Sequence, residues 1–88
     1  MADALHVELI STDRVVWSGD ASFIVARTVD GEIGILRGHT PVLSLLDEGK
    51  VEITPTSGAK FQASVDGGFI SVAHDRVSIL AEHAELGA

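Results

Sequence analysis

The chain has 88 residues and no cysteine, and its 13 acidic residues against six Lys plus Arg give a formal net charge of −7. This length predicts one domain, and the lack of cysteine excludes disulfides, thiolate metal sites and cysteine nucleophiles. The six basic residues are scattered, so nucleic acid and anionic lipid headgroups are poor electrostatic partners.

Apolar and polar residues alternate with a period of two, which is typical of half-buried strands. Val51 and Ile53, for example, alternate with Glu52 and Thr54. Turn-forming residues separate the runs, and Asp30-Gly31 between two apolar runs predicts a hairpin. In chain order we predict strands at 4–11, 14–18, 21–28, 32–36, 42–46, 50–54, 60–65, 69–73 and 76–81.

Short strands at this spacing are typical of an all-β sandwich or barrel, which we place at residues 1–81. Residues 82–88 have a helix-friendly composition but are too few for a stable isolated helix, so we expect a frayed tail or a linker stub. No apolar run exceeds four residues, which excludes a membrane-spanning helix and direct membrane insertion. The N-terminus shows no signal peptide.

The sequence predicts no catalytic or metal site and no cofactor. Histidines lie at positions 6, 39, 74 and 83, and no two have the spacing that would place them on one face of a strand or helix. No Gly-x-Ser-x-Gly elbow is present, and the glycines at 31, 34 and 38 do not match a phosphate-binding loop. Two other interpretations stay open: a metal-dependent β-sandwich enzyme that uses His39, and a lipoyl- or biotinyl-type carrier modified on Lys50.

Residues 31–46 form the most unusual stretch, with three glycines, a histidine and a proline among aliphatic residues. Gly34 inside a predicted strand indicates a bulge or a close backbone approach. Gly38 and Pro41 flank His39 and predict a shaped corner, which together with its apolar surroundings favours docking to another protein. Trp17 is interpreted as an anchor of the core or of a sheet face.

Residues 31–43, GEIGILRGHTPVL, resemble the signature of the ε subunit of the F-type ATP synthase, called δ in mitochondria. Segments 15–19, 65–69 and 77–82 are similar to further segments of that family, in the same order and at the same spacing. The resemblance covers nearly the whole chain. It implies a flattened, ten-stranded β-sandwich or barrel of two antiparallel sheets.

The resemblance also implies a function. The family's subunit is a non-catalytic part of the central stalk, which binds the γ subunit and the c-ring and couples ring rotation to ATP synthesis. Such a protein is peripheral on the cytoplasmic face of the bacterial plasma membrane. The residues implied at the c-ring are Asp30, Gly31, Glu32 and Ile33, and those implied at the γ subunit are Ser11, His39 and Ser44.

This sequence departs from the family pattern at two places. Arg37 stands where many relatives carry proline, and we have no account of it. Most relatives continue into a pair of C-terminal helices that sense ATP and inhibit hydrolysis, whereas this sequence stops at Ala88. As written, the chain is therefore expected to have no C-terminal helical domain and neither of those activities.

Overall fold

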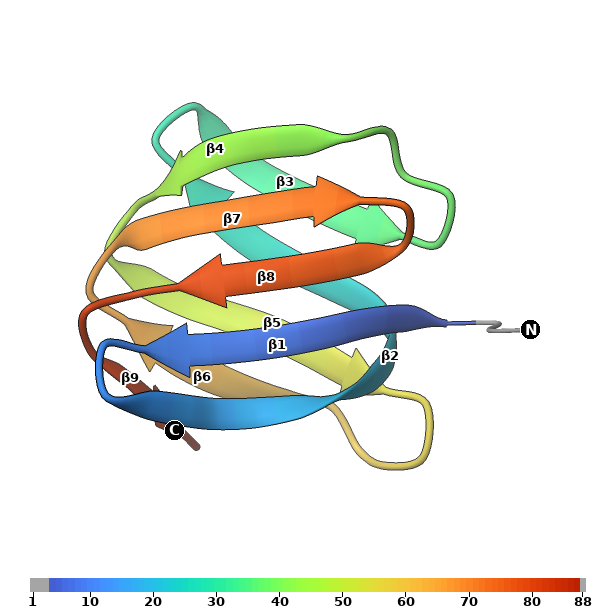
Figure 1. The fold of residues 1–88 in the computed structure, drawn as a ribbon, viewed down its shortest axis with the longest axis horizontal. Helices are drawn as coiled ribbons and strands as arrows, with labels where there is room; N and C mark the ends of the chain where they lie inside the picture. Colours follow the sequence, from blue (N-terminus) through green and yellow to red (C-terminus); the bar gives the residue numbers. More distant parts are fainter. Residues whose placement is uncertain (1–3, 88) are drawn as a thin grey trace.

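A computed structural model describes residues 4–87, and within that range the chain forms nine strands and no helix (Figure 1). Residues 4–87 thus hold no helix long and apolar enough to cross a membrane. The all-β prediction is confirmed. The strands are β1 Leu5–Ser11, β2 Arg14–Thr28, β3 Gly31–Leu36, β4 Val42–Leu46, β5 Gly49–Pro55, β6 Phe61–Val65, β7 Gly68–Ala73, β8 Arg76–Leu80 and β9 Ala84–Leu86.

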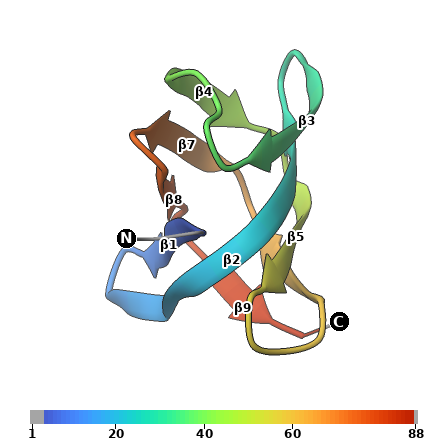
Figure 2. The same cartoon turned by 90° about the vertical axis from the view of Figure 1, so that its right-hand side faces the viewer.

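The strands lie in two layers that enclose one core. Seen along the short axis, β4, β7, β8 and β1 form a front layer, and β3, β5, β6 and β9 lie behind it (Figure 1). β2 runs diagonally between the layers and pairs with strands of both (Figure 2). The sandwich measures 33 × 25 × 20 Å, so its predicted flattened shape is correct.

Two details of the predicted architecture differ. The described residues form nine strands rather than ten, and hydrogen bonds join all of these strands into one continuous sheet rather than two separate sheets. β1 and β8 are parallel, from His6 opposite Arg76 to Ile10 opposite Leu80, so the pairing is not purely antiparallel. A parallel pair needs a long crossover connection, and here the whole chain between β1 and β8 provides it.

β2 joins two strands that the sequence predicts as separate, at 14–18 and 21–28. The intervening Ser-Gly-Asp residues continue the ladder with β1, because Ser18, Gly19 and Asp20 each have a partner on that strand. A register shift against β5 between Ala21 and Phe23 marks a bulge, which lets the strand turn from one layer into the other. This turn carries the hairpin tip at the end of β2 to the edge of the front layer.

The core follows the period-two pattern of the sequence. Along β1, for example, Leu5, Val7 and Leu9 are fully buried, while the residues between them face outward or are half-buried. The interpretation of Trp17 as an anchor is confirmed, since its ring packs edge-on against Phe61 with 5.2 Å between the ring centres.

The C-terminal end corrects the expectation of a frayed tail or linker stub over 82–88. Ala84–Leu86 forms β9, which pairs antiparallel with β6. The amide of His83 donates to Asp66 Oδ1 at 3.1 Å, and Ala84 is buried. An open edge on β6 therefore overrides the local helix preference of this segment.

Candidate functional site

The β2–β3 hairpin carries the residues expected at the c-ring on a tightly held tip. Thr28 pairs with Gly31, which leaves Val29 and Asp30 as a two-residue loop. The buried Thr28 hydroxyl donates to the Gly31 carbonyl at 2.8 Å and accepts the Asp30 amide at 3.1 Å. The Val29 amide donates to the Leu45 carbonyl at 3.0 Å, which fastens the tip to β4. The side chains of Asp30 and Glu32 are left exposed.

A shallow groove of about 240 Å³ lies between this tip and β4. It is lined by Thr28, Asp30, Gly31, Glu32, Ile33, Val42 and Ser44. The structure thus brings Ser44 together with the four residues expected at the c-ring. The other two residues expected at γ, Ser11 and His39, do not line this groove.

His39 lies at the opposite end of β3, in the connection to β4. Its amide donates to the Leu36 carbonyl at 3.1 Å, and its ring Nδ1 lies 2.6 Å from the Thr40 carbonyl. A carbonyl can only accept, so this contact is a hydrogen bond when Nδ1 carries a proton. Among residues 4–87, no group of three His, Cys, Asp or Glu side chains is placed to hold a metal ion.

The corner around His39 is fixed by hydrogen bonds to Asp75, a residue that the sequence analysis did not identify. The Gly38 amide donates to Asp75 Oδ1 at 2.7 Å, and the His6 amide donates to the Asp75 carbonyl at 2.8 Å. Asp75 lies in the two-residue turn between β7 and β8, with positive φ. It therefore ties three segments together at this end of the sandwich.

The bulge predicted at Gly34 is absent, because β3 pairs with β2 without a register shift. The close approach comes instead from a side chain. A Cβ atom at position 34 would lie 3.3 Å from the Phe23 ring, which occupies the space of a side chain there, while the glycine itself stays exposed.

Ser11 ends β1 and is almost fully buried. Its hydroxyl lies 2.9 Å from Asp13 Oδ1, within the turn to β2. It borders an apolar groove of about 220 Å³ that Ile10, Phe69 and Leu80 also line. Ser11 thus marks one end of an apolar surface rather than offering a free hydroxyl.

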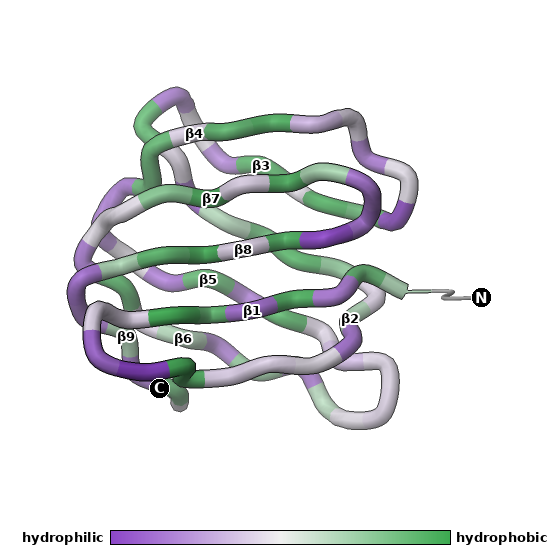
Figure 3. Tube along the Cα trace, in the orientation of Figure 1, coloured by the Kyte–Doolittle hydropathy of each residue, from purple (hydrophilic) through white to green (hydrophobic). Residues whose placement is uncertain are grey.

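Hydrophobic positions occur along β4, β7, β8 and β1 of the front layer (Figure 3). Those that face outward form a surface that we call the apolar row. Leu45, Phe69, Leu80 and Ile10 lie opposite one another on β4, β7, β8 and β1. Leu45, Phe69 and Leu80 keep 53%, 48% and 41% of their surface exposed, and the adjacent Leu43 keeps 73%. Sequence reasoning did not single out these residues. The available signal was that the sequence VLSLL has apolar residues at both sets of alternate positions, so that some of them must face outward.

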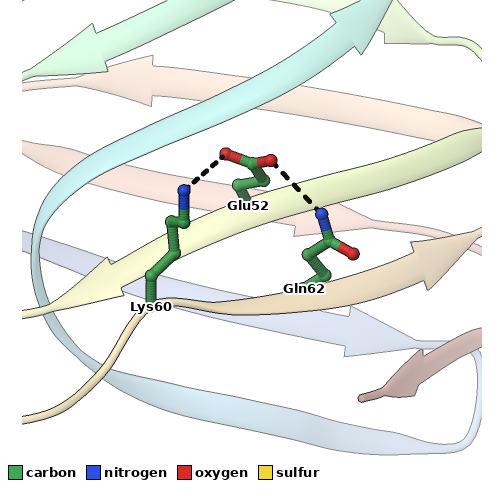
Figure 4. Close-up of polar contacts among 3 residues, drawn as sticks. All are labelled: Glu52, Lys60 and Gln62. Atoms are coloured by element: carbon green, nitrogen blue, oxygen red, sulfur yellow. Dashed lines mark hydrogen bonds and ion pairs between the residues drawn. The ribbon is translucent and has the colours of Figure 1, made fainter. Parts of the chain in front are cut away.

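The outer side of β5 and β6 is polar by contrast (Figure 4). Glu52 accepts a hydrogen bond from Gln62 Nε2 at 3.2 Å, and its other oxygen lies 3.6 Å from Lys60 Nζ. These three side chains satisfy one another. We call them the polar trio.

Residues 4–87 match the family of ATP synthase delta/epsilon chain β-sandwich domains. The chain belongs to this family. The ATP synthase epsilon chain of Streptomyces griseus is 54% identical over 86 residues, which cover 98% of this chain and 69% of that relative. The epsilon chain of Micrococcus luteus is 54% identical over 83 residues, which cover 94% of this chain and 91% of that relative. The relatives therefore include epsilon chains that are clearly longer than the matched region and others that extend little beyond it.

Solved structures share the epsilon fold. A chain in the Euglena gracilis mitochondrial ATP synthase, in a structure of OSCP, F1 and c-ring, superposes with a TM-score of 0.90 at 27% identity. The match covers 98% of this chain and 55% of that one, so this chain spans about half the length of its Euglena counterpart. A chain from the central stalk and c-ring structure of the Tetrahymena thermophila enzyme has the same fold, with a TM-score of 0.76 at 21% identity.

The geometry of Lys50 does not suit the carrier interpretation. A carrier domain presents its lysine at a hairpin tip, whereas Lys50 lies within β5, opposite Ser64 of β6. Lys50 borders a groove that Arg27, Glu48 and Glu52 also line, so it has acidic neighbours. In this epsilon-family domain Lys50 is a solvated strand residue.

Proposed function

We propose that the chain is a non-catalytic rotor subunit in the central stalk of a proton-driven F-type ATP synthase. In this role it binds the γ subunit and the c-ring and couples ring rotation to ATP synthesis. It is held through these partners, peripherally, on the cytoplasmic face of the bacterial plasma membrane. Its membership of the delta/epsilon family and its 54% identity to epsilon chains support the proposal.

The observation that carries the proposal is the apolar row. Contiguous exposed apolar surface on a small domain marks an interaction site, because its burial against a partner is favourable. Phe69 at the centre of the row is an aromatic anchor of the kind that dominates binding energy at interfaces. We assign this surface to the γ subunit, with Ser11 at one end of it.

The hairpin tip is the second surface, which we assign to the c-ring. Its backbone is fixed by hydrogen bonds to Thr28 and Leu45, while Asp30 and Glu32 remain in solvent. A rigid tip with exposed acidic groups suits a polar contact with the loops of another protein. The tip and the row are joined through β4, so the domain can pass rotation between two partners as one body.

The test is co-purification of the 88-residue chain with a γ subunit and with detergent-solubilised c-ring. We expect both to be retained, and we expect Glu32→Lys to lower c-ring binding and coupled ATP synthesis while γ binding stays intact. The unfolding free energy should change by no more than about 0.5 kcal/mol, because the side chain is on the surface. A folded wild-type chain that retains neither partner would overturn the proposal, and a large loss of stability in Glu32→Lys would contradict the tip as an exposed contact.

A further inference from the structure

β3 is an open edge of the sandwich. Among residues 4–87 it pairs only with β2, and no other described strand is hydrogen-bonded to its other side. The hairpin tip bounds the edge at one end, and the corner at His39 bounds it at the other. A strand edge of this kind presents unpaired backbone groups to any extended chain that comes near.

The hydrogen bonds around the tip fix which backbone groups point outward. The Asp47 amide donates to the Arg27 carbonyl, and the Val29 amide donates to the Leu45 carbonyl. The backbone N–H and C=O groups of Arg27 and Val29 therefore point toward β4, and those of Thr28 between them point toward β3. Backbone direction alternates along an antiparallel pair, and the β2–β3 register has no shift. The backbone N–H and C=O groups of Glu32, Gly34 and Leu36 therefore point away from β2. The Leu36 carbonyl agrees, since it accepts the His39 amide rather than a bond from β2.

This edge is weakly protected against strand addition. Natural edges are blunted by lysine, proline or a bulge, and GEIGIL has none of these. Glu32, Gly34 and Leu36 are all exposed, and Leu36 keeps 58% of its surface in solvent. The one charged residue on the edge is Glu32.

We propose that β3 accepts an extended segment of a partner protein as an additional strand of the sheet. Main-chain hydrogen bonds to Glu32, Gly34 and Leu36 would supply affinity, and side chains at alternate positions would supply specificity. Glu32 selects a lysine or arginine, the Phe23 ring that lies over Gly34 offers a surface for a large apolar side chain, and Leu36 selects an aliphatic one. The segment thus carries a basic, a bulky apolar and an aliphatic residue at every second position.

Charge favours such a segment over a second copy of this chain. The chain carries a net charge of −7, and Asp30 and Glu32 lie together at the end of the edge. Two copies would bring like charges together, whereas a basic segment would be attracted. Arg27 lies opposite Glu32 on β2, but no ion pair joins them within the described residues, so the carboxylate is available. The proposal rests on the ladder geometry and does not depend on the rotor function.

The test uses two seven-residue synthetic peptides with lysine, tryptophan and leucine at alternate positions, in opposite chain directions. Each has a control that is N-methylated at the amides that would face β3. Amide hydrogen exchange of the 88-residue chain is followed by NMR. We expect one peptide to protect the amides of Glu32, Gly34 and Leu36, which exchange freely alone, and its methylated control to bind at least tenfold more weakly.

A matched pair of variants separates the backbone from the side chain. Leu36→Ala keeps the outward N–H and should weaken binding about threefold, whereas Leu36→Pro removes that N–H and should weaken it at least tenfold. If Leu36→Pro does not fold, the N-methylated peptides still decide the question. The proposal is overturned if neither peptide protects the three amides at millimolar concentration, or if protection rises with chain concentration alone, which would assign the edge to a second copy.

Discussion

Inward and outward residues alternate along the strands of both the front and the back layer. The outer sides of the two layers nevertheless differ, because one is polar and the other is apolar. On the outer side of the back layer, Glu52 accepts a hydrogen bond from Gln62 and forms an ion pair with Lys60, so these polar side chains have partners within the domain. On the front, Leu45 and Phe69 lie side by side and half exposed, with no described residue covering them. An antiparallel sheet needs one buried face to fold, and both layers have one. The second apolar face is therefore not a requirement of folding, and the γ-binding role proposed above would account for it.

The largest effect on stability is expected at the start of β7, in the front layer. Gly68 opens β7 with a φ of +109°, and a Cβ atom there would collide with the backbone carbonyl oxygen of Leu80. Gly68→Ala should lower the unfolding free energy by about 3–5 kcal/mol, because the backbone must move and β7 separates from β8. Urea unfolding measures this. Gly58→Ala is the control, since no atom lies within 4 Å of its added methyl group, and its stability should be equal or up to about 1 kcal/mol higher. Similar losses in both variants would contradict the close approach.

The second effect concerns binding rather than folding. Phe69→Gln removes the aromatic group at the centre of the apolar row and should weaken binding to γ by about 2 kcal/mol, roughly thirtyfold. Its stability should change by less than about 1 kcal/mol, because the ring is half exposed. Gln62→Ala on the polar trio is the matched control for calorimetric titration with γ. If Gln62→Ala weakened binding as much as Phe69→Gln, the difference between the two outer faces would lose its functional meaning.

A third effect tests how the two layers are held together at the His39 end. Asp75→Ala removes the acceptor of the Gly38 amide and leaves a non-glycine residue at positive φ. We expect a loss of about 1–2 kcal/mol in thermal or urea unfolding. Asp75→Asn keeps an oxygen acceptor and tolerates this backbone conformation, so it should lose less than about 0.5 kcal/mol. Equal losses would show that the charge, and not the hydrogen bond to Gly38, is what matters.

The smallest effect belongs to the polar trio. Lys60→Ala removes an ion pair whose lysine side chain is 60% exposed, and surface pairs of this kind contribute about 0–1 kcal/mol. We expect a loss below about 0.5 kcal/mol, reduced further at high salt. Lys50→Ala, an exposed lysine with no ion pair in the described part of the chain, is the control. A salt-independent loss above 1 kcal/mol would mean that the back face also stabilises the fold substantially.

Much of the fold could be predicted because alternation is a local signal. Val51 and Ile53 are buried and their neighbours are not, as the sequence indicates. A hairpin at this place was predictable for the same reason, although its two loop residues are Val29 and Asp30 and not Asp30 and Gly31. The family was predictable from four segments in register, and its identification is confirmed.

The remaining features depend on partners far away in the chain. Ser18 to Asp20 has a turn-like composition, yet the neighbouring β1 keeps it extended. Ala84–Leu86 has helix-friendly composition, yet the edge of β6 makes it a strand. The bond from Gly38 to Asp75 spans 37 positions, and nothing local to either residue signals it. Ser11 is almost fully buried at the β1–β2 turn, and nothing in its local sequence signals this.

The continuous course of β2 has a mechanical consequence. This strand starts beside β1 in the front layer, crosses to the back and ends at the hairpin tip (Figure 2). A force that acts on the tip along the direction of β2 therefore loads one backbone, whose hydrogen-bond ladders with β1, β3 and β5 run along its length. Hydrogen bonds loaded along the strand direction share a shear force, whereas bonds pulled open at one end yield one after another. β2, which the sequence predicts as two separate strands, is thus one continuous element, and a load applied at the tip is shared by its hydrogen bonds to both layers.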